Sequence, residues 1–175
     1  MLRKAVWTVV LGALLAAPVA LRAQEADIAP RAQISISPIL ALAEVINGEA
    51  EYVFSNELSG VFGLGYFTLG DGADEVRYLA TDLKLRFYPS ATPLEGFSFS
   101  GILGRTSLTD VSTDESGSVF SVGVDLGWSW LFGDTKRWFL GVGLGAKRYF
   151  GEETVGTSSI EAFLPTGRLN FGIAF

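Results

Sequence analysis

The feature that most constrains this sequence is a strict alternation of bulky apolar residues with small or charged ones. Within residues 120–130, every second residue is Phe, Val, Leu or Trp, and the residues between them are Ser, Gly or Asp. The same two-residue period runs through 79–87, 138–147 and 168–175. Successive side chains of a β-strand point to opposite faces, so this period predicts strands with one apolar face. We therefore expect an all-β fold.

The charged residues of these segments share a face with glycine, while the bulky face carries no charge through the middle of any strand. A soluble sandwich would instead bury its bulky residues and expose the polar ones. Long strands with aromatic residues near their ends are typical of a barrel whose apolar face contacts lipid. The aromatic side chains that we expect at the membrane interfaces are Tyr66, Trp128, Trp130, Trp138 and Tyr149.

The first residues have the layout of a secretory signal peptide. Arg3 and Lys4 precede an apolar run that ends at Pro18, and small residues follow up to Ala23. The run is too short to span a bilayer comfortably as a helix. We predict cleavage after Ala23, with Ala20 as the second choice.

The predicted organisation is a signal peptide at 1–23, a short periplasmic segment at 24–32 and one barrel domain at 33–175. Without the signal peptide the chain keeps 10 basic and 19 acidic residues, a net charge of −9, which argues against nucleic acid as a partner. The sequence contains no Cys and no His. Disulfides are therefore excluded, and no Ser–His or Asp–His catalytic arrangement can be assembled. We expect no enzymatic activity, no cofactor and no metal site.

Short turns and longer loops alternate along the chain. The short or proline-punctuated turns are 55–58, 89–93 and 132–135. The longer, polar and acidic loops are 70–75, 109–116 and 151–159. Short turns face the periplasm in outer-membrane barrels, and both termini on that side require an even number of strands. The predicted strands are 33–41, 45–54, 59–69, 76–89, 96–108, 117–131, 137–150 and 161–175.

The link between the first two predicted strands is open to two interpretations. Residues 41–44 contain no Gly, Asn or Pro that would mark a turn, and Pro38 lies within the first strand. Residues 34–54 therefore form either two strands or one long bent strand. With two strands, the fold is a single eight-stranded antiparallel transmembrane β-barrel.

By strand parity, the inward faces carry four acidic and four basic side chains, together with Asn47 and Asn170. An eight-stranded barrel is only just wide enough for its own side chains, so charges inside it must pair. We predict a lumen closed by paired charges. The charge network consists of Glu49, Glu51, Asp82, Lys84, Arg86, Asp125, Lys147 and Arg168. The alternatives are a narrow channel or small-ligand carrier, and a soluble periplasmic barrel with its bulky residues turned inward around an apolar ligand.

Three arginines fall on the lipid-facing side, next to the longer loops: Arg77, Arg105 and Arg148. A lipid-facing Arg costs about 2–4 kcal/mol at mid-bilayer but little near the interface. Guanidinium groups at that height could bind lipopolysaccharide phosphates. The alternative is pairing with acidic residues of the neighbouring loops.

The chain ends in a terminal aromatic residue preceded by apolar residues at alternate positions: Leu169, Phe171, Ile173 and Phe175. This ending resembles the C-terminal assembly signal of bacterial outer-membrane barrels. With the signal peptide, the chain resembles the small eight-stranded barrels of the outer-membrane protein X and protein A type, and within them the outer membrane protein beta-barrel domain families. The resemblance implies insertion into the Gram-negative outer membrane by the barrel-assembly machinery and contact with its lipids. It implies no activity, and we expect a monomer.

Overall fold

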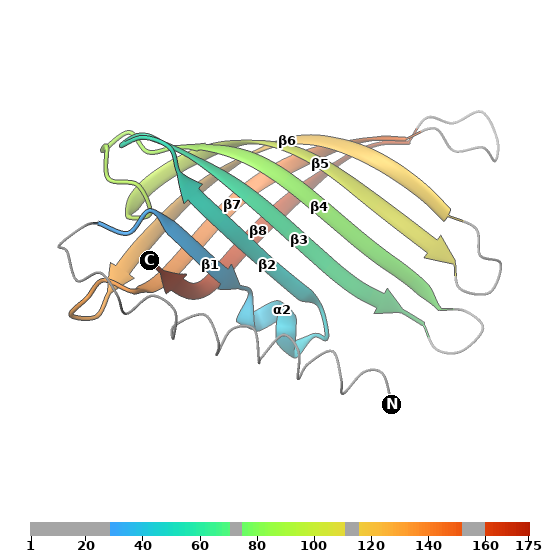
Figure 1. The fold of residues 1–175 in the computed structure, drawn as a ribbon. Helices are drawn as coiled ribbons and strands as arrows, with labels where there is room; N and C mark the ends of the chain where they lie inside the picture. The colour runs from blue at the N-terminus through green and yellow to red at the C-terminus, as the bar shows by residue number, and fades with distance from the viewer. Residues whose placement is uncertain (1–28, 71–74, 111–115, 152–159) are drawn as a thin grey trace. The chain divides into compact units, whose positions relative to one another are not determined.

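The computed structural model describes residues 29–70, 75–110, 116–151 and 160–175, and the predicted signal peptide lies outside them. In the compact unit Pro30–Ala174, eight strands form one closed barrel in which each strand pairs antiparallel with its neighbour in the chain (Figure 1). The strands are β1 (Ala32–Ile36), β2 (Ile46–Val53), β3 (Leu58–Leu69), β4 (Val76–Phe87), β5 (Gly96–Asp110), β6 (Ser116–Phe132), β7 (Trp138–Gly151) and β8 (Ile160–Ala174). The all-β, eight-stranded antiparallel prediction is confirmed, and the last seven strands agree with it to within two residues at each end.

The first predicted strand, 33–41, is wrong beyond Ile36. The chain leaves β1 and forms the short helix α2 (Pro38–Leu42), with proline at the start of the helix, where a missing N–H breaks no hydrogen bond. The reversal is then completed by Glu44, whose φ of 61° is left-handed. Residues 34–54 are therefore two strands joined by a helical turn, not one bent strand. Within the described residues, no helix is long and apolar enough to cross a membrane.

The register of the barrel is strongly staggered. One row of direct strand partners begins at Gly172 of β8 and continues to Ser35 of β1. The row runs around the sheet to Tyr149 of β7 and comes back to β8 at Ala162. The path returns ten residues away from its start on the same strand. A stagger of this kind requires strands that tilt by about 35–45° from the barrel axis. Residues in one hydrogen-bonded row therefore lie at different heights in the barrel.

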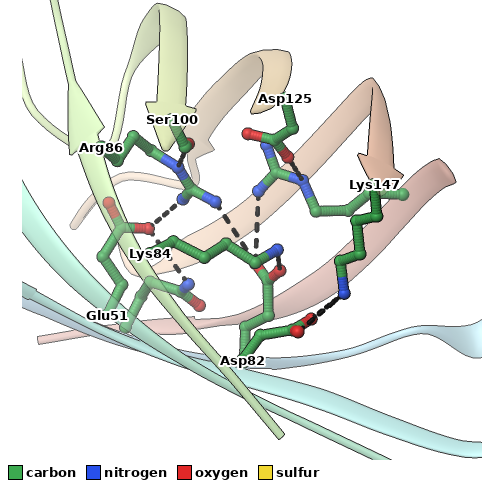
Figure 2. Close-up of polar contacts among 10 residues, drawn as sticks. Glu51, Asp82, Lys84, Arg86, Ser100, Asp125 and Lys147 are labelled. Carbon is green, nitrogen blue, oxygen red and sulfur yellow. Dashed lines mark hydrogen bonds and ion pairs between the residues drawn. The ribbon is translucent and has the colours of Figure 1, made fainter. Parts of the chain in front are cut away.

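Burial alternates along each strand in the sense opposite to that of a soluble protein. On β6, Asp125 and Ser129 are buried, whereas Val124, Leu126 and Trp128 are 64%, 56% and 47% exposed. Figure 2 shows charged side chains of several strands converging on the interior. The barrel thus has a polar inside and an apolar outside, as strand parity predicted.

We call the end that carries the turns after β2, β4 and β6 the short-turn end, and the opposite end the long-loop end. A small apolar core closes the short-turn end: Leu94, from the turn after β4, packs with Val53 and Ala174 and is fully buried, as is Phe139. Leu94 has a left-handed φ of 66°. Such a backbone costs a leucine about 1–2 kcal/mol, which burial of its side chain, at about 1.5–3 kcal/mol, offsets.

Candidate functional site in the barrel lumen

The structure places all eight charged residues of the predicted network inside the barrel. The charges that β2 and β4 contribute are two residues apart because such positions share a face of a strand. The contributing residues are Glu49 and Glu51 from β2, Asp82, Lys84 and Arg86 from β4, Asp125 from β6, Lys147 from β7 and Arg168 from β8. Every one of them has an opposite charge within 3.5 Å.

Glu51 is the most enclosed member, with a fully buried side chain. It forms an ion pair with Arg86, and its two oxygens also accept hydrogen bonds from Ser59 Oγ at 2.5 Å, Tyr88 Oη at 2.7 Å and Gln33 Nε2 at 3.4 Å. Sequence reasoning missed Tyr88, which lies in the turn directly after β4 and continues the parity of Arg86. Burial, together with the Glu51 carboxylate, raises the pKa of Tyr88 above its usual value.

Glu49 lies at the centre of the network and contacts three cations. Lys84 Nζ donates to its Oε1 at 2.5 Å, while Arg86 Nη2 and Arg168 Nη1 reach its Oε2 at 3.4 and 3.3 Å. Arg168 also extends to Asp125, with Nε 3.5 Å from Oδ2. The carboxylates and cations of β2, β4, β6 and β8 are thereby joined across the lumen (Figure 2).

Two glycines make room for Arg168. A Cβ atom on Gly127 would overlap the guanidinium group, and one on Gly143 would lie 3.0 Å from Arg168 Nε. Both glycines face inward, on β6 and β7, where the guanidinium lies against bare backbone. The Gly-rich faces of these strands therefore hold the space that the central cation fills.

Asp82 and Lys147 form a separate pair, in which Nζ lies 2.7 and 2.6 Å from the two carboxylate oxygens. Two residues further along β7, Tyr149 shares the inward face of Lys147 and lies near Tyr78 of β4. Tyr78 in turn stacks on Phe67, with ring centroids 4.4 Å apart. The prediction of Tyr149 as an interfacial aromatic is therefore wrong, since its parity places it in the lumen.

The other four predicted interfacial aromatics lie on outward faces. Trp128, Trp130 and Trp138 are each more than 40% exposed and lie toward the short-turn end, whereas Tyr66 lies on β3 toward the long-loop end. Trp138 stacks on Phe171 of β8 with ring centroids 5.6 Å apart. Aromatic side chains are thus present on the outer surface toward both ends of the barrel.

Arg105 and Arg148 lie on outward faces near the long-loop end, each beside an aromatic ring. The Arg105 guanidinium lies 5.8 Å from the centroid of Phe120, and that of Arg148 lies 5.2 Å from the centroid of Phe150. Arg105, Phe120 and Phe150 belong to one row of direct strand partners. The two arginines and two rings therefore form a local patch on β5, β6 and β7.

Arg77, the third predicted lipopolysaccharide contact, also lies outward, on β4. Its Nε is 3.2 Å from Glu75 Oε1, and its side chain is half exposed. For this residue the structure therefore shows pairing with a neighbouring acid, which was the alternative to an external phosphate.

The predicted assembly signal falls on the last strand. Leu169, Phe171 and Ile173 lie in β8, which ends at Ala174, and Phe175 follows directly. Phe171 is 40% exposed on the outer surface. Recognition of this segment by an assembly machinery stays a prediction.

A cavity of about 180 Å³ lies beside the network and is lined by six of its charged residues, all except Glu51 and Arg86. Three buried atoms of described residues that line it have no hydrogen-bond partner in the structure: Asn170 Nδ2, Asp125 Oδ1 and Arg168 Nε. Among the described residues, no group of three or more acidic, Cys or His side chains could hold a metal ion.

The fold and the site define a class: small, closed, eight-stranded antiparallel β-barrels with a charge-paired interior and an apolar exterior. No family model and no curated protein matches the chain. Among solved structures, it is similar to the N-terminal β-barrel domain of OprF from Pseudomonas aeruginosa, with a TM-score of 0.47, 17% sequence identity and coverage of 83% of this chain and 98% of that chain. At this level of similarity, the assignment of the fold depends on the strand pairing and burial of the chain itself.

Proposed function

We propose that this protein is an integral outer-membrane β-barrel with a structural or surface-interaction role, without enzymatic activity, and with a lumen closed to bulk flow. The observation that carries the proposal is the inverted polarity of the barrel. Leu144 is 75% exposed and Val124 64%, while the Glu51 and Arg86 side chains are buried in the centre. In water, this outer surface would be a large exposed apolar patch, whereas in a membrane it would contact the lipid acyl chains.

Two layers support a closed lumen. The ion pairs of Glu49, Asp125 and Arg168 cross the middle of the barrel, and Leu94 and Phe139 fill the short-turn end. A continuous water path would require both layers to separate. A narrow channel is therefore the weaker candidate.

The soluble alternative requires bulky apolar side chains around a central ligand and charges in open water. Trp128 and Phe171 are instead 47% and 40% exposed, and the Lys84 side chain is only 8% exposed. The lining of the cavity is rich in ionised groups and does not suit an apolar ligand.

Membrane lipids, and lipopolysaccharide in particular, are the partners that we propose for the outer surface. Arg105 and Arg148 would meet phosphate groups at the height of the long-loop end, where their aromatic neighbours Phe120 and Phe150 would lie at the interface. The barrel-assembly machinery is the proposed partner during insertion. The predicted signal peptide would direct export.

The experiment that tests the proposal is gel mobility of unheated and boiled samples from separated inner-membrane, outer-membrane and soluble fractions. We expect the protein in the outer-membrane fraction, with a mobility that changes on boiling. Recovery in the soluble periplasmic fraction would overturn the proposed location. Planar-bilayer recording tests the lumen, and a steady, ion-selective open state would overturn closure.

A further inference from the structure

The inward side chains of the barrel become more accessible toward the long-loop end. Along β4, the exposed fraction of the charged side chains rises from 1% for Arg86 to 8% for Lys84 and 18% for Asp82. Because β4 runs from the long-loop end to the short-turn end, this gradient points to access from the long-loop end. The apolar core around Leu94 and the buried Phe139 closes the opposite end. The cavity of about 180 Å³ lies on the accessible side of the charge network.

The most accessible charges that line the cavity form one ion pair, Asp82 with Lys147 (Figure 2). On β4, Ala80, Asp82 and Lys84 line the cavity, whereas the residues between them do not. Lys147 of β7 lines it without either of its neighbours in the chain. Because alternate positions share a face of a strand, these residues face the cavity with their side chains.

The two lysines have hydrogen-bonding capacity that the described residues do not use. An ammonium group has three donors, and a carboxylate can accept about four hydrogen bonds. Lys147 Nζ contacts the two oxygens of Asp82, and Lys84 Nζ donates to Glu49. At least one donor of Lys147 and two of Lys84 are therefore left for a ligand, and the Asp82 oxygens can each accept a further bond.

Uncharged polar side chains lie on the same lining. Asn47 of β2 and Thr166 of β8 occupy inward positions and are each partly exposed. A Cβ atom on the inward-facing Gly145 would lie 2.9 Å from Thr166 Oγ1, so this hydroxyl is directed into the lumen. The inward side chains of Ala80 and Ile102 add a small apolar part. The lining therefore combines donors, acceptors and a limited apolar surface.

The balance of charge in the lining favours a ligand that carries both signs. The six charged residues of the lining are three acids and three bases, so a free anion or cation gains little net attraction. A zwitterion gains from both partners of the accessible ion pair. In an α-amino acid, the ammonium and carboxylate groups are separated by one carbon atom, which matches the close spacing of Lys147 and Asp82. Aligned antiparallel to this pair, the ligand places each of its charges beside the opposite charge.

We propose that the cavity is a binding site for a small zwitterionic solute of the α-amino acid class, which enters from the long-loop end. The ligand carboxylate accepts hydrogen bonds from Lys147 and Lys84, and its ammonium donates to Asp82. Thr166 and Asn47 bond to the remaining polar edges of the ligand. The cavity volume of about 180 Å³ corresponds to about six water molecules at about 30 Å³ each, which suits a molecule of the size of alanine rather than a peptide or a sugar. The inference goes beyond the proposed function, because a lumen closed to bulk flow can still bind a solute above the closure.

The test is equilibrium dialysis of the detergent-solubilised protein against radiolabelled L-alanine. Two smaller relatives of alanine serve as competitors: propionate, which lacks the ammonium group, and ethylamine, which lacks the carboxylate. We expect one saturable site per barrel, and competition at least about tenfold weaker from either relative, because each loses its charge-assisted hydrogen bonds.

Two alanines provide a matched pair of variants. Ala80→Leu fills the cavity and should reduce alanine binding at least about tenfold, whereas Ala50→Leu adds the same side chain to the exposed outer face of β2 and should bind like the parent. Thr166→Val should weaken binding about three- to tenfold through the loss of one hydrogen bond. Unchanged heat-dependent gel mobility shows that a variant retains the barrel.

Asp82→Asn tests the ion pair itself. It should bind alanine at least about tenfold more weakly and propionate more tightly than the parent does, because Lys147 is released from its carboxylate. A purely structural role of Asp82 would not produce this exchange of preference. If Ala80→Leu does not fold, Asp82→Asn and Thr166→Val still decide.

Absence of saturable alanine binding in the parent would overturn the proposal. Binding of propionate to the parent as tight as that of alanine would define an anion site instead, with the same consequence. Equal alanine binding by folded Ala80→Leu and parent proteins, or unchanged preference in Asp82→Asn, would place the ligand elsewhere and also overturn it. Failure of the proposed function would appear separately, as loss of the protein from the outer-membrane fraction, because binding in detergent does not depend on cellular location.

Discussion

Arg86 of β4 and Glu51 of β2 form a fully buried ion pair that spans the intervening strand β3. Ser59 of β3 donates to the same carboxylate, so one acidic side chain connects three neighbouring strands. Exposure of the two charged side chains is 1% and 0%. Neither charge has access to water as a substitute partner; Arg86 also reaches Glu49, whereas Arg86 is the cation that Glu51 pairs with.

Replacing Arg86 with methionine should lower the free energy of unfolding by about 3–5 kcal/mol, because it leaves Glu51 buried without its cation. Adding Glu51→Leu to Arg86→Met should recover only part of this loss, because Ser59, Tyr88 and Gln33 then lose the acceptor of their hydrogen bonds. Urea unfolding in lipid vesicles, followed by gel mobility, measures both. The matched control is Lys136→Met, which breaks the exposed pair with Glu95 and should cost less than about 1 kcal/mol. A similar small loss for Arg86→Met would contradict a central role of the pair.

Gly127→Ala should destabilise the barrel by about 1–3 kcal/mol, because the added methyl group overlaps the Arg168 guanidinium and forces it away from Glu49 and Asp125. Gly101→Ala is the control, since open space surrounds its Cβ position. The same urea titration compares the two. If both alanine variants unfold at the same urea concentration, the space beside Arg168 is not limiting.

Alkaline conditions should weaken the short-turn end through Tyr88. Its pKa in the folded protein is raised above the usual value near 10 by burial and by the Glu51 carboxylate. The folded chain therefore holds the phenol proton more tightly than the unfolded chain. The stability that this phenol contributes is complete below about pH 10 and declines as pH rises beyond it.

Comparing urea midpoints at about pH 8 and about pH 11 tests this dependence. Tyr88→Phe should show a smaller decline than the parent, although it starts from a lower stability because it loses the hydrogen bond to Glu51. Tyr52→Phe, which alters a tyrosine 55% exposed on the outer surface, should decline like the parent. If the urea midpoint declines equally in all three proteins, groups other than Tyr88 cause the loss of stability at alkaline pH.

Joint replacement of Arg77, Arg105 and Arg148 by alanine should reduce the lipopolysaccharide retained through purification several-fold, because charge-assisted bonds to phosphate would be lost. Phosphate assay of the purified protein measures the retained lipid. Lys136→Ala removes a cation near the short-turn end and should leave retention unchanged. If the triple variant retains as much lipopolysaccharide as the parent protein, the assignment of these arginines as lipopolysaccharide contacts is wrong.

Much of this architecture follows from a single rule, the alternation of side chains along a strand. It placed Asp125 and Lys147 in the lumen without any knowledge of their partners, and applied consistently it would also have placed Tyr149 there. Strand parity does not determine the position of a residue along the barrel axis, however. Arg168 meets Glu49 because of the tilt and stagger of the strands, which depend on pairing between distant segments.

The features that sequence reasoning missed are short and local. Helix α2 replaces half a strand because Pro38 can begin a helix as readily as interrupt a strand edge. Leu94 is buried in a turn with a left-handed backbone, which propensity alone would not assign to a leucine. In both cases tertiary packing decided among conformations that the residues themselves permit.

The few pairs between β1 and β8 have a consequence for how the barrel forms. Gln33 and Ala174 are partners although nearly the whole barrel sequence separates them, whereas the other neighbouring strands are connected directly in the chain. Bringing such distant segments together carries the largest entropy cost of any pairing, and only a few residue pairs compensate for it. The curved sheet from β2 to β8 should therefore form first, and docking of the five-residue β1 should be the late, slow event. Gly172 permits this step, because a Cβ atom there would meet the backbone of Ser35 at 2.6 Å.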